Sequence, residues 1–369
     1  MKTLILHASV GGGHRSAALA LAEAFRELDP GGTVEARDVL EFTPPFFRRL
    51  YAEVYAWLVN NTPEVWGYLY EHGGRRTAER KTARLVRAFD RLNYRRFLGF
   101  LERFGPDALV ATHFLPSEIL FPLAEKGKFS LPYYLVLTDH DAHAWWVRRG
   151  PRCFFVGSEE VRVLLEAAGI EPDRIRVTGI PVSRRFRQGP DRQEACRALG
   201  IPEEAKVVLL VGGASGIEEI LPFARALAGL EDTWTLAVAG RNEELAGKFD
   251  ELASGAPRFR PYRFVENIEV LMSAAHVVIT KSGGLTTSEC LALGRPMIIV
   301  RPTPGQEDRN ADYLLESGAA WKARTPESLR WKIRRLWSQP DCLERLSRSA
   351  RALGRPEAAE SIARHVLAG

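Results

Sequence analysis

The sequence predicts an α/β protein of two domains, each a mostly parallel sheet covered by helices. With 369 residues, the chain is long enough for two domains that each bury a core. Short apolar runs alternate with amphipathic helical segments in both halves, which is the pattern of β-α units. A polar, turn-rich stretch at residues 181–193 separates the two series. We therefore place the boundary near residue 188, giving domains 1–187 and 188–349. A final helix at about 350–369 could pack back on the first domain.

The first half opens with a strand at residues 3–9, three glycines and a helix over 14–28. A second strand is expected at residues 33–40. Residues 46–104 differ, because they are helical in pattern, aromatic and rich in arginine. Buried strands then return at residues 108–114, at 132–139 and at 153–158, the last followed by a helix from Glu159. Residues 174–181 continue the alternation.

The second half restarts the same alternation of strands and helices. Strands are expected at residues 207–213, 234–240, 258–264, 276–280 and 296–302, and helices follow most of them. In parallel sheets, ligands sit beyond the carboxyl ends of the strands. The glycine-rich segments beginning at Gly11, Gly212 and Lys281 all fall at such ends. Two such edges facing one another would form a cleft between the domains.

Composition and charge exclude several classes of protein. The net charge of +5 does not by itself indicate a nucleic-acid binder. Four scattered cysteines (Cys153, Cys196, Cys290 and Cys342) indicate reduced thiols in a cytosolic protein, because they lack disulfide or zinc spacing. The N-terminus lacks the basic and apolar regions of a signal peptide. No apolar run approaches the ~20 residues that span a bilayer. We therefore expect a cytoplasmic protein.

Residues 276–314 carry the sharpest ligand-binding pattern in the chain. Ser282, Gly283 and Gly284 form a turn between a strand and a helix, where small residues and a helix N-terminus accommodate phosphate oxygens. Glu289, about one turn into that helix, is placed to accept hydrogen bonds from two ribose hydroxyls. The next loop brings Gln306, Glu307 and Asn310, which suit sugar hydroxyls. A single glycine turn before a surface helix would look similar, but the joint pattern over two β-α units favours a nucleotide site.

Several segments together resemble the GT-B glycosyltransferases, and most closely the processive diacylglycerol glucosyltransferases and monogalactosyldiacylglycerol synthases. This family is related to the peptidoglycan N-acetylglucosaminyltransferase. The resemblance lies in the glycine loop and helix, the Thr-Asp-His-Trp segment, the inter-domain turn and the sugar-nucleotide loops, at residues 8–21, 138–147, 177–186, 281–289 and 304–311. It covers most of the chain apart from residues 46–104 and the C-terminal tail.

The resemblance implies a GT-B fold, with two Rossmann-like domains whose parallel sheets face across a cleft, and a UDP-sugar donor. It places the diphosphate on Ser282, Gly283, Gly284, Leu285 and Thr286, the ribose on Glu289, and the donor sugar on Gln306 and Glu307. Arg263, Phe264 and Val265 would present backbone to uracil, with Arg241 near the nucleotide. Gly12, Gly13 and Gly213, at the other glycine-rich strand ends, complete the predicted donor-binding set.

The first glycine loop ends in His14, which has two interpretations. The loop lacks the GxGxxG spacing of a dinucleotide site, and residues 212–216 lack the GxSxG pattern of a serine hydrolase. His14 could simply cap its helix. At a helix N-terminus its pKa would be lowered, which favours a neutral base. The resemblance assigns His14 the catalytic role, with Asp139 and His143 as rival or supporting groups.

A metal site has weaker support than an acid–base site. His140, Asp141 and His143 have side chains that ligate metals, but no acidic DxD motif lies in a suitable loop. GT-B enzymes generally need no metal. We therefore expect neither a metal nor a cofactor.

Residues 46–104 are the predicted acceptor side. They hold twelve Lys and Arg residues against six acids, a net +6, interleaved with Trp and Tyr. This composition suits an anionic membrane surface, although an arginine-coated helical pair packed on the domain would share it. A nucleic-acid partner is less favoured, because no recognised motif accompanies the charge. The predicted acceptor and membrane residues are Trp57, Arg48, Arg49, Arg75, Arg76 and Trp146.

These observations predict an inverting transfer of glucose or galactose from UDP-glucose or UDP-galactose to 1,2-diacylglycerol. The enzyme would lie on the inner face of the cell membrane as a peripheral protein. The alternatives are another enzyme of the same fold, acting on a polyprenol-linked sugar or epimerising a UDP-sugar at C2, and a non-catalytic UDP-sugar sensor.

Overall fold

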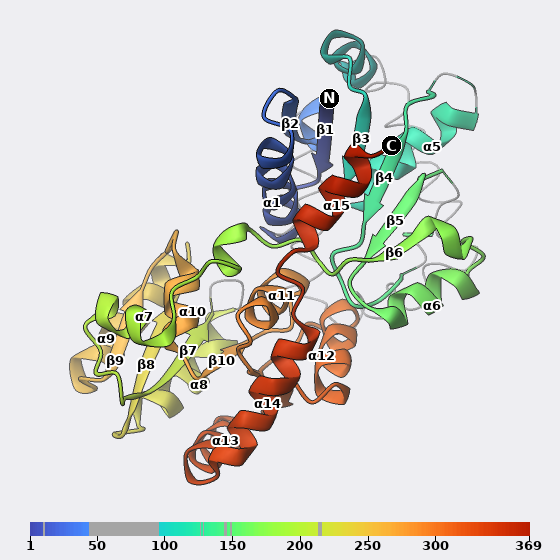
Figure 1. The fold of residues 1–369 in the computed structure, drawn as a ribbon. Helices are drawn as coiled ribbons and strands as arrows, with labels where there is room; N and C mark the ends of the chain where they lie inside the picture. Colours follow the sequence, from blue (N-terminus) through green and yellow to red (C-terminus); the bar gives the residue numbers. More distant parts are fainter. Residues whose placement is uncertain are drawn as a thin grey trace. The chain divides into compact units, whose positions relative to one another are not determined.

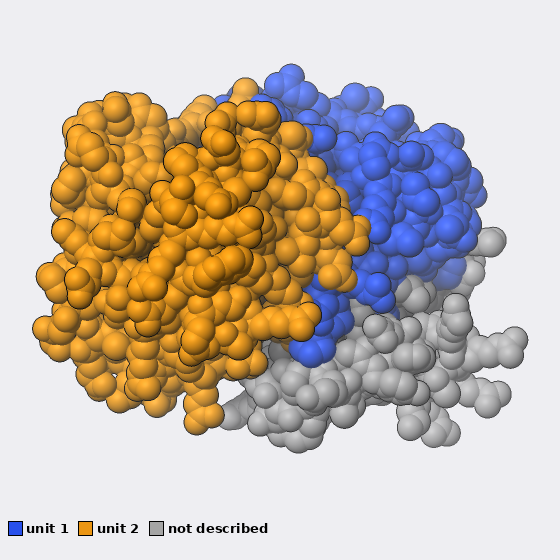
Figure 2. Space-filling model, turned by 90° about the horizontal axis from the view of Figure 1, so that it is seen from below, with its two compact units in different colours: residues 1–184, 304–309, 355–369 blue, residues 185–303, 310–354 orange. Residues whose placement is uncertain are grey.

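The computed structural model describes residues 1–9, 12–43, 96–125, 127, 129–143, 146–147, 150–212 and 216–369. They form two compact units, coloured separately in Figure 2. The first unit comprises Met1–Arg184, Pro304–Arg309 and Arg355–Gly369. The second comprises Arg185–Thr303 and Asn310–Gly354. The predicted domain boundary near residue 188 is not tested by this division into units, and it stays a prediction.

The first unit is built on a six-stranded sheet in the order β2-β1-β3-β4-β5-β6 (Figure 1). Every pair of neighbouring strands is parallel, as the β-α alternation predicts. The strands are β1 (Lys2–His7), β2 (Thr33–Asp38), β3 (Ala108–Ala111), β4 (Tyr133–Val136), β5 (Cys153–Val156) and β6 (Ile175–Val177).

The helices of the first unit are α1 (Gly12–Leu28), α5 (Phe114–Glu125), α6 (Glu159–Ala167) and α15 (Ala358–Leu367), with short 3-10 turns at Val39–Phe42, Pro172–Arg174 and Arg184–Phe186. Of these, α1 and α6 begin within two residues of the predicted positions, α15 begins about eight residues later than predicted, and α5 was not predicted. Residues 96–104 are also helical. The strand predicted at residues 33–40 ends two residues early. The carboxylate of Asp38 accepts a hydrogen bond from the Leu40 backbone at 2.9 Å and starts the 3-10 turn.

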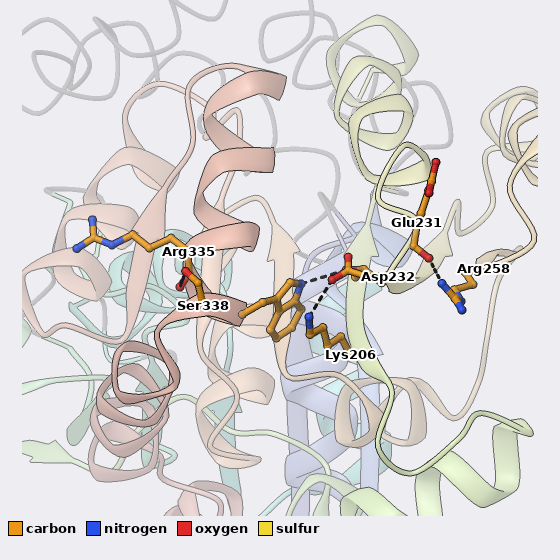
Figure 3. Close-up of polar contacts among 8 residues, drawn as sticks. Lys206, Glu231, Asp232, Arg258, Arg335 and Ser338 are labelled. Carbon is orange, nitrogen blue, oxygen red and sulfur yellow. Dashed lines mark hydrogen bonds and ion pairs between the residues drawn. The ribbon is translucent and has the colours of Figure 1, made fainter.

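The second unit repeats the plan with a sheet in the order β12-β11-β10-β7-β8-β9, again parallel throughout. Its strands are β7 (Lys206–Val211), β8 (Thr233–Val238), β9 (Phe259–Tyr262), β10 (Val277–Thr280), β11 (Met297–Ile299) and β12 (Ala320–Lys322). At the amino edge of this sheet, Lys206 Nζ donates to Asp232 Oδ2 at 2.8 Å (Figure 3). The Trp337 indole nearby donates to Thr233 Oγ1 at 3.0 Å.

Capping side chains fix where several helices of the second unit begin. Asp191 and Glu194 form a reciprocal capping box at the start of α7, and Asn242 and Thr325 cap α9 and α13. The helices are α7 (Arg192–Leu199), α8 (Ile217–Ala228), α9 (Glu243–Gly255), α10 (Ile268–Ala274), α11 (Gly284–Ala292), α12 (Gln306–Glu316), α13 (Pro326–Ser338) and α14 (Pro340–Leu353). The first four residues of α12 belong to the first unit.

Each sheet is buried under helices, which explains why its strands are apolar throughout rather than alternating. In the first unit, Ile362 and Val366 of α15 belong to the same core cluster as Phe25 of α1 and Val110 of β3. In Figure 1, α15 runs alongside α1. The four cysteines are free and buried, as their spacing predicts.

Candidate functional site

Three neighbouring strands of the first sheet carry the candidate acid–base groups. His14 lies in the first turn of α1, which follows β1. Thr112 and His113 follow β3, and Thr138 and Asp139 come two and three residues after the end of β4. Because β1, β3 and β4 are adjacent and parallel, their carboxyl ends share one edge. Residues about a hundred positions apart in sequence thereby become neighbours.

The His14 imidazole is held by two threonines. Its Nδ1 lies 2.8 Å from the Thr112 carbonyl oxygen and 3.0 Å from Thr138 Oγ1. A carbonyl oxygen can only accept a hydrogen bond, so in this contact Nδ1 carries the proton and Nε2 keeps its lone pair. The Thr112 hydroxyl donates in turn to the His14 carbonyl at 2.9 Å. This geometry prepares Nε2 to accept a proton.

Burial lowers the pKa of His14, while Asp139 and the Thr112 carbonyl act in the opposite direction. The sequence predicts a lowered pKa from the helix N-terminus; the direction is confirmed, and burial is the principal cause. Burial, followed by the nearby His14 and His7, holds the pKa of His113 well below its usual value. The His113 ring stands edge-on to His14, with centroids 4.5 Å apart. The half-buried His14 and the buried His113, both with lowered pKa values, therefore form the base-like part of the site.

Asp139 and His143, in the segment after β4, are buried polar groups. Asp139 is 3% exposed, and its Oδ2 accepts a hydrogen bond from Gln306 Nε2 at 2.6 Å. Gln306, predicted to contact the donor sugar, thus contacts a candidate catalytic carboxylate within the first unit. His143 is buried, and its carbonyl accepts from the Trp146 backbone at 2.8 Å. The catalytic roles of His14, Asp139 and His143 stay predictions.

Trp146 was predicted on the acceptor and membrane side, and its side chain is buried. Its ring lies 6.2 Å from the rings of both His14 and His113, and it meets Phe114 edge-on at 5.8 Å. Trp146 therefore forms a wall of the histidine site. A role toward the acceptor stays a prediction.

In the second unit, the N-terminus of α11 presents backbone donors. Its N-cap residue is Gly283, which supplies no side chain to bond the first-turn N–H groups. The Thr287 and Ser288 hydroxyls turn back to carbonyls of the preceding turn, at 3.0 and 2.7 Å. No acidic residue lies in the first turn. These features suit an anion such as a diphosphate.

Glu289 lies farther along α11, largely shielded from solvent. Burial raises the pKa of Glu289 to about 8, with Arg185 lowering it and Glu269 raising it. Arg185 forms an ion pair with Glu269, with Nε and Oε2 3.6 Å apart. A carboxyl in such surroundings is stabilised when a ligand donates hydrogen bonds to it. The two neighbouring hydroxyls of a ribose are donors of this kind.

The two predicted donor loops are joined by Asn310, whose predicted role is wrong. The sequence suggested that Asn310 contacts sugar hydroxyls, but its side chain is fully buried. Its Nδ2 donates to the Ser282 carbonyl at 3.0 Å and braces the loop before α11. Glu307 lies in the first turn of α12 and is half-buried. Its proposed contact with a sugar stays a prediction.

Arg241 and Phe264, predicted near the nucleotide base, follow the adjacent strands β8 and β9. The Arg241 guanidinium lies 4.8 Å from the centroid of the Phe264 ring, which is 56% exposed. Arg263 is engaged by Glu243 and Asp250 at 3.3 and 3.1 Å. An exposed aromatic ring at the carboxyl edge of a sheet suits a planar base beside it.

Some predicted residues lie outside the described part of the chain. These are Gly213 and the acceptor-side residues Trp57, Arg48, Arg49, Arg75 and Arg76. In the described residues, no three or more His, Cys, Asp or Glu side chains gather as a metal site would require. Among the described helices, none combines the length and apolar character needed to cross a membrane.

The two halves of the chain match two protein families. Residues 14–182 match the monogalactosyldiacylglycerol synthase family, and residues 207–362 match the glycosyltransferase family 28 C-terminal domain. Proteins named processive diacylglycerol beta-glucosyltransferase are similar over the whole chain. The one from Bacillus cytotoxicus is 27% identical over 99% of this chain and 93% of its own length. One from Bacillus cereus is 28% identical over 100% of this chain and 93% of its own.

Solved structures share the fold at low sequence identity. Acinetobacter baumannii MurG aligns with a TM-score of 0.64 and 16% identity, over 100% of this chain and 99% of that protein. The complex of S. aureus MnaA with UDP gives 0.66 and 12%, over 99% and 96%. Anabaena HepE bound to UDP-glucose gives 0.56 and 14%, over 100% and 99%. With two parallel six-stranded sheets, these likenesses confirm the predicted GT-B fold.

Proposed function

We propose that this chain, a member of the glycosyltransferase family of the monogalactosyldiacylglycerol synthases and processive diacylglycerol glucosyltransferases, transfers a hexose from a UDP-sugar to 1,2-diacylglycerol with inversion at C1. The chain is a hexosyltransferase by family, and the donor, acceptor and stereochemistry are the proposal. The observation that carries it is the half-buried His14 imidazole, whose pKa is lowered and whose Nδ1 is hydrogen-bonded to the Thr112 carbonyl.

His14 supplies the general base in this proposal. The acceptor hydroxyl of diacylglycerol gives its proton to Nε2 as its oxygen attacks C1 of the donor sugar. The bond from C1 to the UDP oxygen breaks, and UDP leaves with the electron pair. Asp139, close enough to raise the pKa of His14, stabilises the imidazolium that forms. His143 is a second candidate for support of the site.

The second unit holds the donor nucleotide in this proposal. The uncapped N–H groups of α11 receive the diphosphate and stabilise the charge on departing UDP. Glu289 accepts hydrogen bonds from the ribose hydroxyls, and Phe264 and Val265 lie against uracil. No metal or cofactor is required, because the charge stabilisation comes from backbone dipoles. Gln306 and Glu307 contact the hexose.

The acceptor lipid resides in a membrane, so the enzyme must meet a bilayer. We propose that residues 46–104, with their net charge of +6, dock on the anionic inner face of the cell membrane. The lipid then presents its hydroxyl partly out of the bilayer. This makes the protein a peripheral membrane enzyme.

Product analysis tests the function directly. Purified protein is incubated with diacylglycerol and either UDP-glucose or UDP-galactose, and the lipid and nucleotide products are identified by mass and by NMR of the anomeric proton. A β-linked hexosyl-diacylglycerol from one donor is expected, since UDP-hexoses carry an α-linked sugar. An epimerised nucleotide sugar formed without acceptor would instead favour the epimerase alternative. Absence of any turnover would favour a UDP-sugar sensor.

A further inference from the structure

Helix α13 places an exposed tryptophan among cations on the surface of the second unit. Its buried face consists of Leu329, Ile333 and Leu336, which pack into the core of this unit. On the opposite face, Trp331 is 55% exposed, although tryptophan carries more apolar surface than any other residue. Arg334 and Arg335 lie one turn farther along the same face and are exposed. The helix is therefore amphipathic with an aromatic residue on its charged side.

Two rings and two cations form one cluster here. Lys332 Nζ lies 5.3 Å from the centroid of the Trp321 ring and 5.5 Å from that of Trp331. The Arg335 guanidinium carbon lies 5.6 and 5.4 Å from the same two centroids. Figure 3 shows the Arg335 side chain directed away from the Lys206–Asp232 pair at the amino edge of the sheet. The cations thus hold the Trp331 ring in place without covering it.

Positive charge outnumbers negative charge in this region of the sequence. Residues 322–335 contain six Lys and Arg residues and one acid, Glu327. In the part of the chain that the structure describes, Arg324, Lys332, Arg334 and Arg335 form no ion pair with a carboxylate. The neighbouring helix α14 differs, because Arg348 on its surface pairs with Glu344 at 2.7 Å. Within α13 itself, four cations (Arg330, Lys332, Arg334 and Arg335) stand against one acid, Glu327, which leaves a local excess of positive charge.

We propose that this surface, formed by Arg324, Trp331, Lys332, Arg334 and Arg335 with Trp321 beneath (the α13 face), is a membrane-contact site of the second unit that binds the anionic headgroups of a bilayer. It is separate in sequence from the basic segment at residues 46–104, and it does not depend on which lipid accepts the sugar.

Three features favour a bilayer as the partner. Tryptophan prefers the membrane–water interface, because its ring is apolar while its N–H bonds to headgroups. Unpaired cations nearby are attracted to anionic lipid within a Debye length. Because Trp331, Arg334 and Arg335 share the outer face of α13, a bilayer lying along that face contacts the ring and the cations together. An acidic protein would pair with the cations but would not account for the exposed tryptophan. Single-stranded nucleic acid would place its bases against the tryptophan ring, and the test below includes it as an outcome.

The test compares full-length variants for co-sedimentation with vesicles. One variant is Arg334→Ser with Arg335→Ser, and the second is Trp331→Ala. The matched control is Arg348→Ser with Arg364→Ser, which removes the same charge from two arginines that are ion-paired with glutamates. Vesicles contain equal parts of phosphatidylcholine and phosphatidylglycerol, or phosphatidylcholine alone. Unfolding temperature and UDP affinity report folding, and hexose transfer to detergent-dispersed diacylglycerol reports the active site separately.

The double variant should bind anionic vesicles about fivefold more weakly for each cation removed. Trp331→Ala should weaken binding to anionic vesicles too, and the matched control should lose clearly less than the double variant. All variants should keep UDP affinity and transfer in detergent, and a wild-type enzyme inactive with diacylglycerol would leave the vesicle comparison intact. Equal loss in the matched control would overturn the proposal, since net charge alone would then explain binding. It would equally be overturned if Trp331→Ala weakened binding to single-stranded RNA and left vesicle binding intact.

Discussion

The carboxyl edges of the two sheets are prepared for chemistry in opposite ways. In the first unit, side chains already bond one another: His14 is fixed by Thr112 and Thr138, and Asp139 by Gln306. In the second unit, α11 leaves backbone N–H groups without a side-chain cap, and Glu289 is buried at a cost to its ionisation. In the proposed function, the first edge is organised for proton transfer before any ligand arrives. The second edge would gain its polar partners when a nucleotide binds.

The largest effect that this comparison predicts is on turnover. His14→Ala should lower kcat by about 10²–10⁴, the usual contribution of a positioned base. UDP affinity should stay nearly unchanged, since the proposed nucleotide contacts come from the second unit. Steady-state rates and calorimetry with UDP measure the two effects separately.

Asp139→Ala and His143→Ala are the comparison for His14. If His14 is the base, its loss flattens the acidic limb of the pH–rate profile, while the other two variants keep that limb. Near-normal turnover in His14→Ala, together with an inactive Asp139→Ala, would reassign the base to Asp139. His14 would then be a cap on α1.

For Glu289, by contrast with His14, we expect substitution to change UDP affinity. Glu289→Ala should weaken UDP binding by about fivefold to a hundredfold, because two hydrogen bonds from the ribose hydroxyls are lost and each bond to an uncharged acceptor contributes about 0.5–1.5 kcal/mol. Glu289→Gln keeps one acceptor oxygen and should be milder. Calorimetry with UDP and with the deoxyribose analogue measures this. An unchanged dissociation constant in Glu289→Ala would remove the residue from the site.

How far the sequence predicts the molecule depends on the range of the interactions. The strand and helix around Lys281 are predicted well, because an apolar run, a glycine turn and a helical pattern are adjacent in sequence. The contacts of His14 with Thr112 and Thr138 span 98 and 124 residues. They exist only because β1, β3 and β4 are neighbours in the sheet. No local pattern contains that order, so both threonines were missed.

The error at Asn310 was avoidable from the sequence. Asn310, Ala311 and Leu314 lie on one face of α12, and all three are buried. A polar residue in register with apolar ones on a helix is expected to face the core and bond a buried group. The sequence prediction extends the loop through residue 310, whereas α12 begins at Gln306. With the helix start misplaced, the helical spacing of these three residues is not apparent.

The buried carboxyl of Glu289 should also affect stability. With a folded pKa of about 8 against an ordinary value of 4.5, the folded state keeps a proton that the unfolded state loses between these pH values. The free energy of unfolding therefore falls over this window as pH rises. Glu289→Gln removes the titration. Its unfolding temperature should exceed that of the wild type increasingly from pH 4.5 to about 8.

A matched substitution on the exposed surface of α9, Glu244→Gln, should show no such growing difference. Thermal melts across the pH series supply the measurement. A constant difference between wild type and Glu289→Gln over the whole series would mean that the carboxyl is ionised in the folded protein. The contrast between the two edges would then be weaker.

The smallest effect concerns the hydroxyl that holds the base. Thr138→Val keeps the shape of the side chain but removes the oxygen 3.0 Å from His14 Nδ1. One neutral hydrogen bond contributes about 0.5–1.5 kcal/mol, so kcat should fall about two- to tenfold with KM little changed. Because the hydroxyl accepts from Nδ1 more strongly when the ring is charged, its loss should lower the pKa of His14. The acidic limb of the pH–rate profile should then move to lower pH.

Thr112→Val is the control, because it removes a hydroxyl that bonds the main chain. It should leave the acidic limb at the wild-type position. A limb that stays in place in Thr138→Val would show that this hydroxyl does not contact the base during turnover, and the first edge would be less organised than its contacts indicate.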